Sequence, residues 1–477
     1  MNPQERYQKL EQHLALENPV LLDIISVYKE LDRIGYKTGL LEKNESYAAR
    51  ISWWPLISIL GTFSAGKSSF INTYIGKQIQ STGNQAVDDK FTVLTYGNNE
   101  EIHTLPGLAL DADPRFPFFG ISEEVNKVDS GKGNRIDSYL QLKTTNSDGL
   151  RGKIIIDSPG FDADSQRNST LRITDHIIDM SDLVLVFFDA RHPEPGAMRD
   201  TLEHLVSKTI DRNDYDKVLF ILNQIDTAAL EDNPEEVIGA WQRALSQQGL
   251  VGGNFYTIYN EQVANVIENE ALAERFKRKK DEDLARLTTR IDKVSIERAY
   301  RIANALEKVA NDIMNKQMPA VQKAMQSWRN KVILADIVVF GALIAGSTYL
   351  LSLTGALDVA VSEWSITQAL SGSVTYSAIV GIILLTVIFS IHGYLKSTLA
   401  DWSAKRIAKN EPAIAKALLH NSRIWRGMFH KTPRGWGAAN VRNVINIVNA
   451  SKKAIQKLND QFADPSGNKK ADLKEVK

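Results

Sequence analysis

Apolar runs along the first 260 residues have the length and composition of strands that are buried on both faces. These runs alternate with stretches of helical periodicity, and they predict strands at 56–60, 138–143, 153–156, 182–188, 217–222 and 255–259. Runs such as LVLVFF and KVLFIL do not alternate between apolar and polar residues, which is typical of central strands covered by helices on both sides. The pattern therefore predicts an α/β domain with a mostly parallel sheet.

Helical periodicity precedes and follows this domain. Residues 4–35 carry two apolar stripes separated by Asn18-Pro19, and residues 262–330 carry another. We expect the charged segment 276–283 to be a solvated face of the second region. The chain after 396 is basic and helical to about residue 462, and its polar end is expected to be disordered.

Two long apolar segments lie between these helical regions. Residues 333–353 contain one charged side chain, Asp336, and residues 374–395 contain no Asp, Glu, Lys or Arg. At about 1.5 Å per residue, each would reach about 30 Å, the thickness of a bilayer core. The segments therefore predict two transmembrane helices. A pair of buried core helices and a hairpin that enters the bilayer without crossing it remain alternatives.

The charges around the apolar segments predict their orientation. The link 355–373 has two acids and no Lys or Arg, whereas basic residues flank the pair, namely Arg329, Lys331, Lys396, Lys405, Arg406 and Lys409. By the positive-inside rule, both flanks face the cytosol. We expect an integral membrane protein with two spans and with cytosolic N- and C-termini. Residues 1–13 mix charges and lack an apolar core, so no signal peptide is expected.

These patterns predict the following organisation along the chain. The segments are N-terminal helices (1–50), an α/β domain (51–261), a helical arm (262–331), a transmembrane hairpin (332–396), a basic helical tail (397–462) and a disordered end (463–477).

Composition narrows the choice of partners. The chain has 57 basic and 57 acidic residues, and the resulting net charge of zero indicates no nucleic-acid partner. It contains no cysteine, which excludes disulfides and thiolate metal sites. The histidines show no spacing typical of metal ligands, and no nucleophile–base pair suggests covalent catalysis.

The stretch GTFSAGKSSF follows the first predicted strand and has the glycine, lysine and serine spacing of a phosphate-binding loop. Its glycines allow backbone N–H groups to surround phosphate oxygens. We expect Lys67 to reach the β- and γ-phosphates and the Ser68 hydroxyl to bind Mg²⁺. The expected nucleotide-binding residues of this loop are Gly61, Thr62, Phe63, Ser64, Ala65, Gly66, Lys67, Ser68 and Ser69.

Two further motifs follow buried strands. IIIDSPG places Asp157 where a carboxylate would hold Mg²⁺ through water, and Gly160 where its N–H would reach the γ-phosphate. NQID contributes Asn223, Gln224 and Asp226; a carboxylate there accepts hydrogen bonds from guanine N1–H and the 2-amino group. Open α/β sheets bind ligands at the carboxyl ends of their strands, so the three motifs together predict one nucleotide site.

GTFSAGKSSFIN, DSPG and NQID together resemble the dynamin superfamily of large GTPases. The strings HTLPGLALDADPRFPF, IIIDSPGFDADSQR and DLVLVFFDAR are most similar to the Eps15-homology-domain-containing ATPases, over roughly residues 1–319. No Eps15-homology domain is expected after them. The resemblance implies N-terminal helices, a nucleotide domain and a helical arm whose tip contacts lipid, and the two apolar segments stand where that tip would be. A paired span beside a large GTPase is also similar to mitofusins.

The sequence departs from this resemblance in switch I and at the expected dimer interface. Val87 and Asp88 stand where the family has adjacent threonines in switch I, which predicts slow hydrolysis unless Thr82 or Thr92 replaces them. Phe63 is similar to the aromatic residue that the Eps15-homology family has at that position of the loop.

The tryptophan that the family places at its dimer interface would fall at Arg243, and Trp241 lies two residues away.

The resulting hypothesis is a membrane-anchored dynamin-like GTPase. It would bind and hydrolyse nucleoside triphosphate with Mg²⁺ and would self-associate to remodel, tether or scaffold a lipid bilayer. One alternative is the same machine using ATP, because the most similar family uses adenine nucleotides. Another is a membrane-bound switch that recruits a partner without remodelling. A nucleotide-gated transport component is a third.

Overall fold

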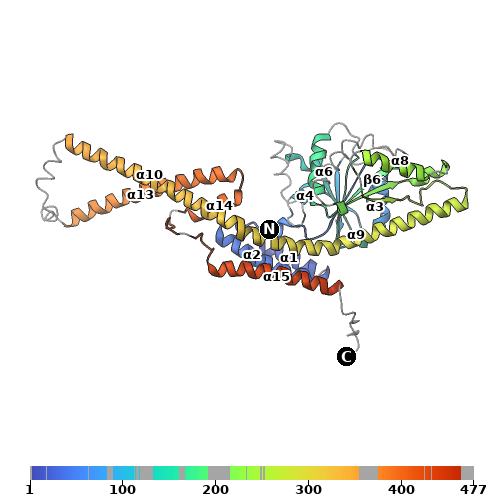
Figure 1. Ribbon diagram of the computed structural model, residues 1–477, viewed down its shortest axis with the longest axis horizontal. Coiled ribbons are helices and arrows are strands. Elements are labelled where there is room, and N and C mark those ends of the chain that lie inside the picture. The colour runs from blue at the N-terminus through green and yellow to red at the C-terminus, as the bar shows by residue number, and fades with distance from the viewer. Residues whose placement is uncertain are drawn as a thin grey trace, which may run out of the picture. The chain divides into compact units, whose positions relative to one another are not determined.

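The computed structural model describes residues 3–17, 19–62, 64–82, 90–111, 113, 116, 118, 133–160, 167–191, 215–231, 234–247, 250, 253–353, 374–423, 425–430 and 432–462. The chain forms two compact units. The sheet unit comprises residues 8–17 and 49–302, and the helical unit comprises Met1–Tyr7, Asn18–Ala48 and Ala303–Lys477. Figure 1 shows the elements of each unit.

The sheet unit is built on an eight-stranded sheet in the order β3-β4-β2-β5-β1-β6-β7-β8. Its strands are Leu56–Gly61 (β1), Phe91–Tyr96 (β2), His103–Pro106 (β3), Leu140–Thr145 (β4), Ile154–Asp157 (β5), Leu183–Asp189 (β6), Val218–Asn223 (β7) and Asn254–Thr257 (β8). From β5 through β8 all neighbours are parallel, whereas β2 runs antiparallel to β5. The predicted mostly parallel α/β sheet is confirmed. The sequence prediction missed β2 and β3, which extend it.

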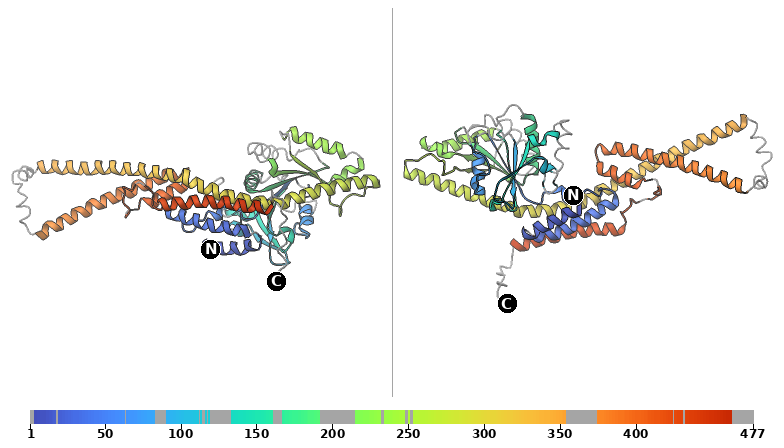
Figure 2. Two further views of the ribbon diagram at one scale, coloured as in Figure 1. Left: turned by 60° about the horizontal axis from the view of Figure 1, so that its bottom comes forward. Right: turned by 180° about the vertical axis from the view of Figure 1, so that it is seen from behind.

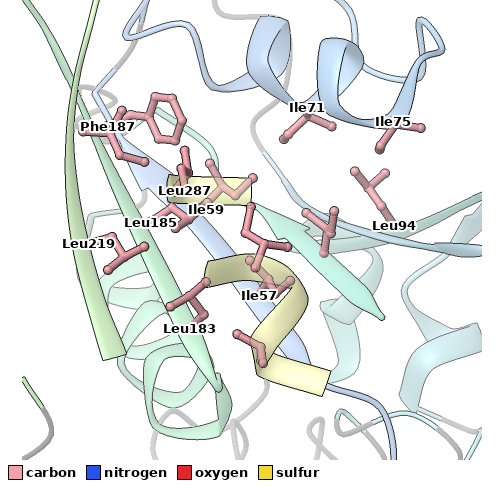
Figure 3. Close-up of a cluster of buried hydrophobic side chains, with 14 of the residues drawn as sticks. Ile57, Ile59, Ile71, Ile75, Leu94, Leu183, Leu185, Phe187, Leu219 and Leu287 are labelled. Atoms are coloured by element: carbon pink, nitrogen blue, oxygen red, sulfur yellow. The ribbon is translucent and has the colours of Figure 1, made fainter. Parts of the chain in front are cut away.

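The central strands send alternate side chains to opposite faces of the sheet. In β6, Leu183, Leu185 and Phe187 join one apolar cluster, and the intervening Val184, Val186 and Phe188 join another. The first cluster includes Ile71 of α3 (Lys67–Ile75) and Leu287 of α9 (Glu270–Asp312) (Figure 3). The second includes Trp241 of α8 (Pro234–Gln247). Burial on both faces explains the unbroken apolar runs of these strands.

α4, α6 and part of α1 also belong to the sheet unit. α4 (Leu108–Asp111) follows β3, and α6 (Arg167–Met180) precedes β6 and packs Ile173 and Ile177 against β1 and β5. α1 (Pro3–Glu17) contributes residues 8–17. Trp53, which the sequence places just before β1, is buried.

Most of the charged segment 276–283 is exposed, as expected of a solvated face, but two of its charged residues are buried. Lys280 and Asp283 are 6% and 1% exposed. Asp283 accepts hydrogen bonds from the backbone N–H and the hydroxyl of Thr257, at 2.9 and 3.0 Å, while Lys280 lies 2.6 Å from Glu261. Buried charges are stable only with such partners, so these residues fasten α9 to the end of β8.

The helical unit contains α2 (Pro19–Thr38), α10 (Met318–Leu353), α13 (Val374–Ala408), α14 (Pro412–Asn421) and α15 (Ala438–Phe462). α9 continues through a π-helical turn, Ile313–Gln317, into α10. α2 and α15 lie side by side (Figure 2), and Lys457 of α15 lies 2.6 Å from Asp23 of α2. An apolar cluster joins α10, α13 and α14. It contains Trp328 and Val332 of α10, Ala400 of α13 and Leu418 of α14.

Two helices of this unit are long and apolar enough to cross a membrane, as the two predicted segments require by length and composition. Only 6% and 11% of their most apolar windows are buried. Leu343 on α10 and Leu384 on α13 are 52% and 57% exposed. Burial this low counts against the alternative of two core helices. Residues 354–373, which link the pair, lie outside the described residues.

A hydrogen bond joins the two apolar helices. His392 Nδ1 of α13 lies 2.9 Å from Asp336 Oδ2 of α10, and both side chains are half-buried. Polar groups within an apolar helix pair are costly unless they have partners. The pair therefore connects α10 and α13, a contact that neither residue's sequence context indicated.

Candidate functional site

The phosphate-binding loop connects β1 to α3, as its position after the first strand predicted. Gly66 has φ +81°, and a Cβ at this position would lie 2.1 Å from Nδ2 of Asn223. Only glycine combines the left-handed backbone with this close approach. The loop therefore delivers the chain to the N-terminus of α3, where backbone N–H groups and the helix dipole favour an anion.

Lys67 is held against the beginning of the loop. Its ammonium donates to the carbonyl oxygens of Gly61 and Thr62, at 3.0 and 2.9 Å, and the residue is 8% exposed. The register of β1 with β6 places Gly61 opposite Phe187, so the loop leaves the sheet at the centre of its carboxyl edge. A buried cation beside a helix N-terminus is chemically suited to bind a triphosphate. Phe63 lies outside the described residues.

Ser68 and Asp157 come together at the same edge. β1 and β5 are paired with Ile59 opposite Asp157, and this register brings Oγ of Ser68 to 3.5 Å from Oδ2 of Asp157. A hydroxyl and a carboxylate are the hard oxygen ligands that Mg²⁺ prefers. Among the described residues, no group of three or more His, Cys, Asp or Glu gathers around a common point. The two side chains therefore fit a Mg²⁺ ion whose other ligands are phosphate oxygens and water.

Two residues that the motifs do not contain fix the carboxylate of Asp157. Gln80 is 2% exposed, and its Nε2 donates to Oδ2 of Asp157 at 2.6 Å. Lys143 of β4 donates to Oε1 of Gln80 at 2.7 Å, which fixes the orientation of the amide. Asn72 of α3 accepts from the backbone N–H of Gln80 at 2.9 Å. Sequence reasoning missed this chain of hydrogen bonds, and only the fold brings its members together.

The NQID segment follows β7 and is bonded directly to the phosphate-binding loop. Asn223 Nδ2 donates to the carbonyl oxygen of Ala65 at 2.9 Å, and Gln224 Nε2 donates to that of Ser64 at 2.6 Å. Gln224 and Ser64 both have positive φ, 63° and 60°. Strained backbone of this kind persists where the surroundings hold it, and it is common at ligand-binding loops. The amides of the two predicted residues thus hold the loop in shape.

Asp226 lies one turn further along and is 5% exposed. Its Oδ2 accepts from the backbone N–H of Asn265 at 3.0 Å. Burial raises the pKa of the Asp226 carboxyl, while the N–H of Asn265 and the guanidinium of Arg191 lower it. Asn260, in the same segment after β8, donates to the Ser69 hydroxyl at 3.0 Å. No sequence signal identifies Asn260 or Asn265, because the segment after β8 carries no motif.

The remaining predicted positions are placed as follows. Gly160 is the last described residue after Asp157, since 161–166 lie outside the described residues. Val87 and Asp88 also lie outside them. Thr92 is on β2, fully buried, and its hydroxyl accepts from Gln141 Nε2 at 2.7 Å, so it is not on a switch loop. Thr82 is exposed and remains the described candidate for a switch I hydroxyl.

Trp241 is a core residue of the sheet unit. It is fully buried, with its ring 5.4 Å from that of Phe188 and 5.5 Å from that of Phe255, centroid to centroid. It is therefore not available for an intermolecular contact in this fold. Arg243, two residues further along α8, is exposed.

The three motifs thus meet at the carboxyl edge of one sheet, and this arrangement defines a P-loop nucleotide-binding domain. The family model for the dynamin family matches residues 57–225. The chain carries a GTPase domain of the dynamin family, and it is distantly similar to the EH domain-containing proteins.

Human EH domain-containing protein 2 is 25% identical over 221 residues, which cover 43% of this chain and 37% of that protein. EH domain-containing protein 1 of Bos taurus is 26% identical over 179 residues, which cover 36% of this chain and 31% of that protein. The chain thus matches about a third of the length of these curated relatives.

Among solved structures, one similar chain comes from an oligomerised bacterial dynamin pair described as a mechanism for long-range sensing and tethering of membranes. It is 14% identical, with a TM-score of 0.37, and the match covers 95% of this chain and 78% of that chain. The LeoA bacterial dynamin GTPase from ETEC is 15% identical, with a TM-score of 0.29 and the same coverage of both chains. Both TM-scores are too low to define a shared overall arrangement.

Proposed function

We propose that this protein is a membrane-anchored dynamin-like GTPase that hydrolyses GTP and self-associates to remodel, tether or scaffold a bilayer. One observation carries the proposal. A chain whose phosphate-binding loop, Asp157 and NQID segment meet at one site continues into two long helices with exposed apolar surfaces. In this proposal, the nucleotide domain is 51–261, the helical arm 262–331 and the membrane hairpin 332–396, with both termini on the cytosolic side.

The residues at the site have distinct roles in the proposed reaction. The loop N–H groups and the ammonium of Lys67 bind the β- and γ-phosphates and stabilise the charge that develops as water attacks the γ-phosphorus. The N–H of Gly160 binds the γ-phosphate. Ser68 and Asp157 would hold Mg²⁺, which neutralises negative charge on the phosphate oxygens. Gln80 keeps the Asp157 carboxylate oriented toward Ser68.

Guanine is the proposed base. The ionised Asp226 carboxylate accepts hydrogen bonds from N1–H and the 2-amino group, whereas adenine presents an acceptor at N1. Low solvent exposure of Asp226 strengthens such a contact, because water competes with it less. ATP use is the alternative, and a direct comparison of the two nucleotides decides between them.

The exposed apolar helices support membrane anchorage. Soluble proteins rarely expose large continuous apolar surfaces, and both stretches match the bilayer thickness. Nucleotide binding would favour pairing of the sheet units of neighbouring molecules. The arm would transmit this pairing to the anchored helices.

Vesicle tethering by the full-length protein tests the proposal. Reconstituted liposomes are mixed with GTP, ATP or a non-hydrolysable GTP analogue, and their clustering is followed by dynamic light scattering. We expect clustering or a change of vesicle shape with GTP or its analogue. Lys67→Ala should abolish it, whereas Lys43→Ala, which removes an exposed lysine outside the site, should leave it intact.

Clustering driven by ATP in preference to GTP would transfer the mechanism to adenine nucleotides. Protein that binds nucleotide in liposomes but stays monomeric, and leaves the vesicles unchanged, would contradict membrane work and indicate a recruiting switch.

A further inference from the structure

The segment between α14 and α15, residues 422–437, presents two large aromatic side chains to solvent; we call it the basic loop. Trp425 and Phe429 are 74% and 73% exposed. Between them, Met428 is buried against Trp328 and Val332 of α10 and against residues of α13 and α14. Met428 thus fastens the loop to the helices while the neighbouring rings face outward, so their exposure is not the result of a detached segment.

Three guanidinium groups of this loop gather without an acidic partner. Arg426 donates to the backbone carbonyl of His420 and lies 3.1 Å from Nε2 of that imidazole. Among the described residues, no carboxylate lies within ion-pair distance of Arg423, Arg426 or Arg434. Burial, then Arg434 and Arg423, lower the pKa of Arg426. Burial, then Arg426 and the other two arginines, lower the pKa of His420 to about 4.

His420 is therefore neutral at physiological pH, and the positive charge of this surface comes from the arginines. Three like charges held together repel each other, and an anion with several oxygens relieves that repulsion. Arginine forks bind phosphate oxygens in pairs. The cluster therefore fits phosphate groups. Because Arg423 and Arg434 are exposed, they are placed to bind phosphates on a surface rather than in a cavity.

The basic loop lies where the apolar part of α13 ends. Lys396, the first charged residue after the apolar segment 374–395, is 4% exposed and donates to the carbonyl oxygen of Arg426 at 2.5 Å. Its own carbonyl accepts from the indole N–H of Trp328 on α10 at 3.2 Å. α14 runs back along α13 toward the apolar half of that helix, and the loop follows on that side (Figures 1 and 2).

Further exposed aromatic residues lie at this end of the apolar segment. Tyr394 and Trp402 of α13 are 71% and 53% exposed, and the ammonium of Lys331 lies 4.7 Å from the ring centroid of Trp402. Aromatic and basic side chains gather in this way at the boundary between a bilayer core and water. Trp425 and Phe429 extend the same belt beyond the two helices.

We propose that the basic loop docks on the anionic phospholipid headgroups of the bilayer. Its arginines bind lipid phosphates, and Trp425 and Phe429 enter the interface. This inference rests on the proposed membrane anchorage and adds a second contact, which holds the helical unit against the membrane surface. Salt weakens the docking, because the charges involved are exposed.

The absence of cysteine from the sequence allows a site-specific test. Phe429→Cys in the full-length protein is labelled with an environment-sensitive fluorophore and reconstituted into neutral phosphatidylcholine vesicles or into vesicles containing phosphatidylserine. We expect a blue shift and protection from an aqueous quencher in the anionic vesicles. A label at Lys409→Cys, just past the end of α13 and about 20 Å from Lys396 at 1.5 Å per residue, should remain accessible.

Removing positive charge from the basic loop tests whether its arginines contact the lipid headgroups. Arg423→Gln with Arg434→Gln should lower the ratio of docked to undocked loop by about 30-fold, since each basic residue near an anionic surface contributes about fivefold. Lys405→Gln with Arg406→Gln removes the same charge from exposed positions on α13 and should change little. Equal loss in both double variants would overturn the assignment to the loop and indicate a general charge effect.

Alkaline extraction separates this proposal from the anchorage. A pelleted protein whose Phe429→Cys label stays quenchable in anionic vesicles would overturn the docking alone. A protein released by alkaline carbonate would overturn the anchorage and, with it, the docking at the end of the spans. An equal spectral shift caused by inorganic phosphate in detergent would indicate a small-anion site instead of a membrane surface.

Discussion

The sheet unit and the apolar half of the helical unit use the same residue types in opposite ways. In β6 every side chain is buried, and Leu185 is 0% exposed between helices on both faces of the sheet. On α13, Leu384 is 57% exposed, and its apolar neighbours also face outward. An apolar run thus has two physical solutions. The short apolar run of β6 is buried within the protein. Under the proposed function, the run of about 20 residues on α13 is covered by the hydrocarbon core of a bilayer.

The polar residues differ in the same way. In the sheet unit, buried polar groups meet at the strand ends, where Asn223, Asp157 and Gln80 are hydrogen-bonded to other residues of the site. Within the apolar segments 333–353 and 374–395, Asp336 of α10 and His392 of α13 form a hydrogen bond. The first arrangement prepares a binding site, and the second joins two helices at low polar cost.

Replacing leucine by arginine in the two regions should give the largest of the expected effects. The result should differ between Leu185 in the core and Leu384 on α13. Leu185→Arg places an unpaired charge in the core and should destabilise the sheet unit by about 3–5 kcal/mol. Leu384→Arg should leave the melting temperature and nucleotide binding in detergent unchanged, but should oppose bilayer insertion by about 2.5–3.5 kcal/mol. Thermal melting and alkaline extraction measure the two effects. A loss of melting temperature for Leu384→Arg that equals that of Leu185→Arg would show that α13 is a core helix.

The two glycines that flank α3 test the account of the nucleotide site. Gly66 and Gly76 have φ of +81° and +74°, so alanine at either should cost about 1–2 kcal/mol of stability. Only at Gly66 would the new Cβ meet another side chain, Nδ2 of Asn223 at 2.1 Å, whereas nothing lies within 4 Å at Gly76. Gly66→Ala should therefore weaken nucleotide binding by more than about tenfold in a fluorescence titration. Gly76→Ala should bind as the wild type does, and equal affinities of the two variants would refute the role of Gly66.

Gln80 tests whether the residues outside the motifs matter. Gln80→Leu leaves the Asp157 carboxylate without its amide donor, so the Mg²⁺ concentration for half-maximal turnover should rise by about 10-fold or more. Gln141→Leu removes a half-buried glutamine of β4, which donates to Thr92, and should leave that concentration unchanged. Gln80→Glu keeps the shape but places a second carboxylate beside Asp157 and should not restore activity. An unchanged Mg²⁺ requirement in Gln80→Leu would remove Gln80 from the mechanism.

The pH dependence of binding is the smallest expected effect. Burial raises the pKa of Asp226, so the carboxylate loses its charge at a higher pH than an ordinary aspartate. Guanine binding requires the ionised form, so GTP affinity should fall as the pH drops toward that raised pKa. Stability without nucleotide should change in the opposite direction, since protonation relieves the cost of a buried charge. Measured over the same pH range, Asp226→Asn should show neither the fall in GTP affinity nor the rise in stability at low pH. An identical fall in GTP affinity in that variant would assign the titration to another group.

Sequence patterns predicted the central strands and all three motifs, because burial on both faces and phosphate binding each impose local residue types. They missed β2, whose Thr92 and Thr95 interrupt the apolar run FTVLTY. They also failed for Lys280 and Asp283, since local charge does not show that Thr257 and Glu261 lie opposite. Such pairings are set by the tertiary fold.

The same limit applies to the site. Gln80 reaches Asp157, Lys143 reaches Gln80 and Asn265 reaches Asp226 from segments distant in sequence, so no local spacing identifies them. Thr92 could be weighed as a switch residue from sequence, whereas its burial and its bond to Gln141 became visible only in the fold.

Nucleotide turnover by the full-length protein in liposomes, measured with GTP and ATP at increasing surface density, tests the central claim most directly. If the nucleotide site and the membrane helices form one machine, GTP turnover per molecule should rise steeply with density, because neighbouring sheet units then pair and complete the site. Slow turnover that is independent of density, despite tight nucleotide binding, would contradict this account.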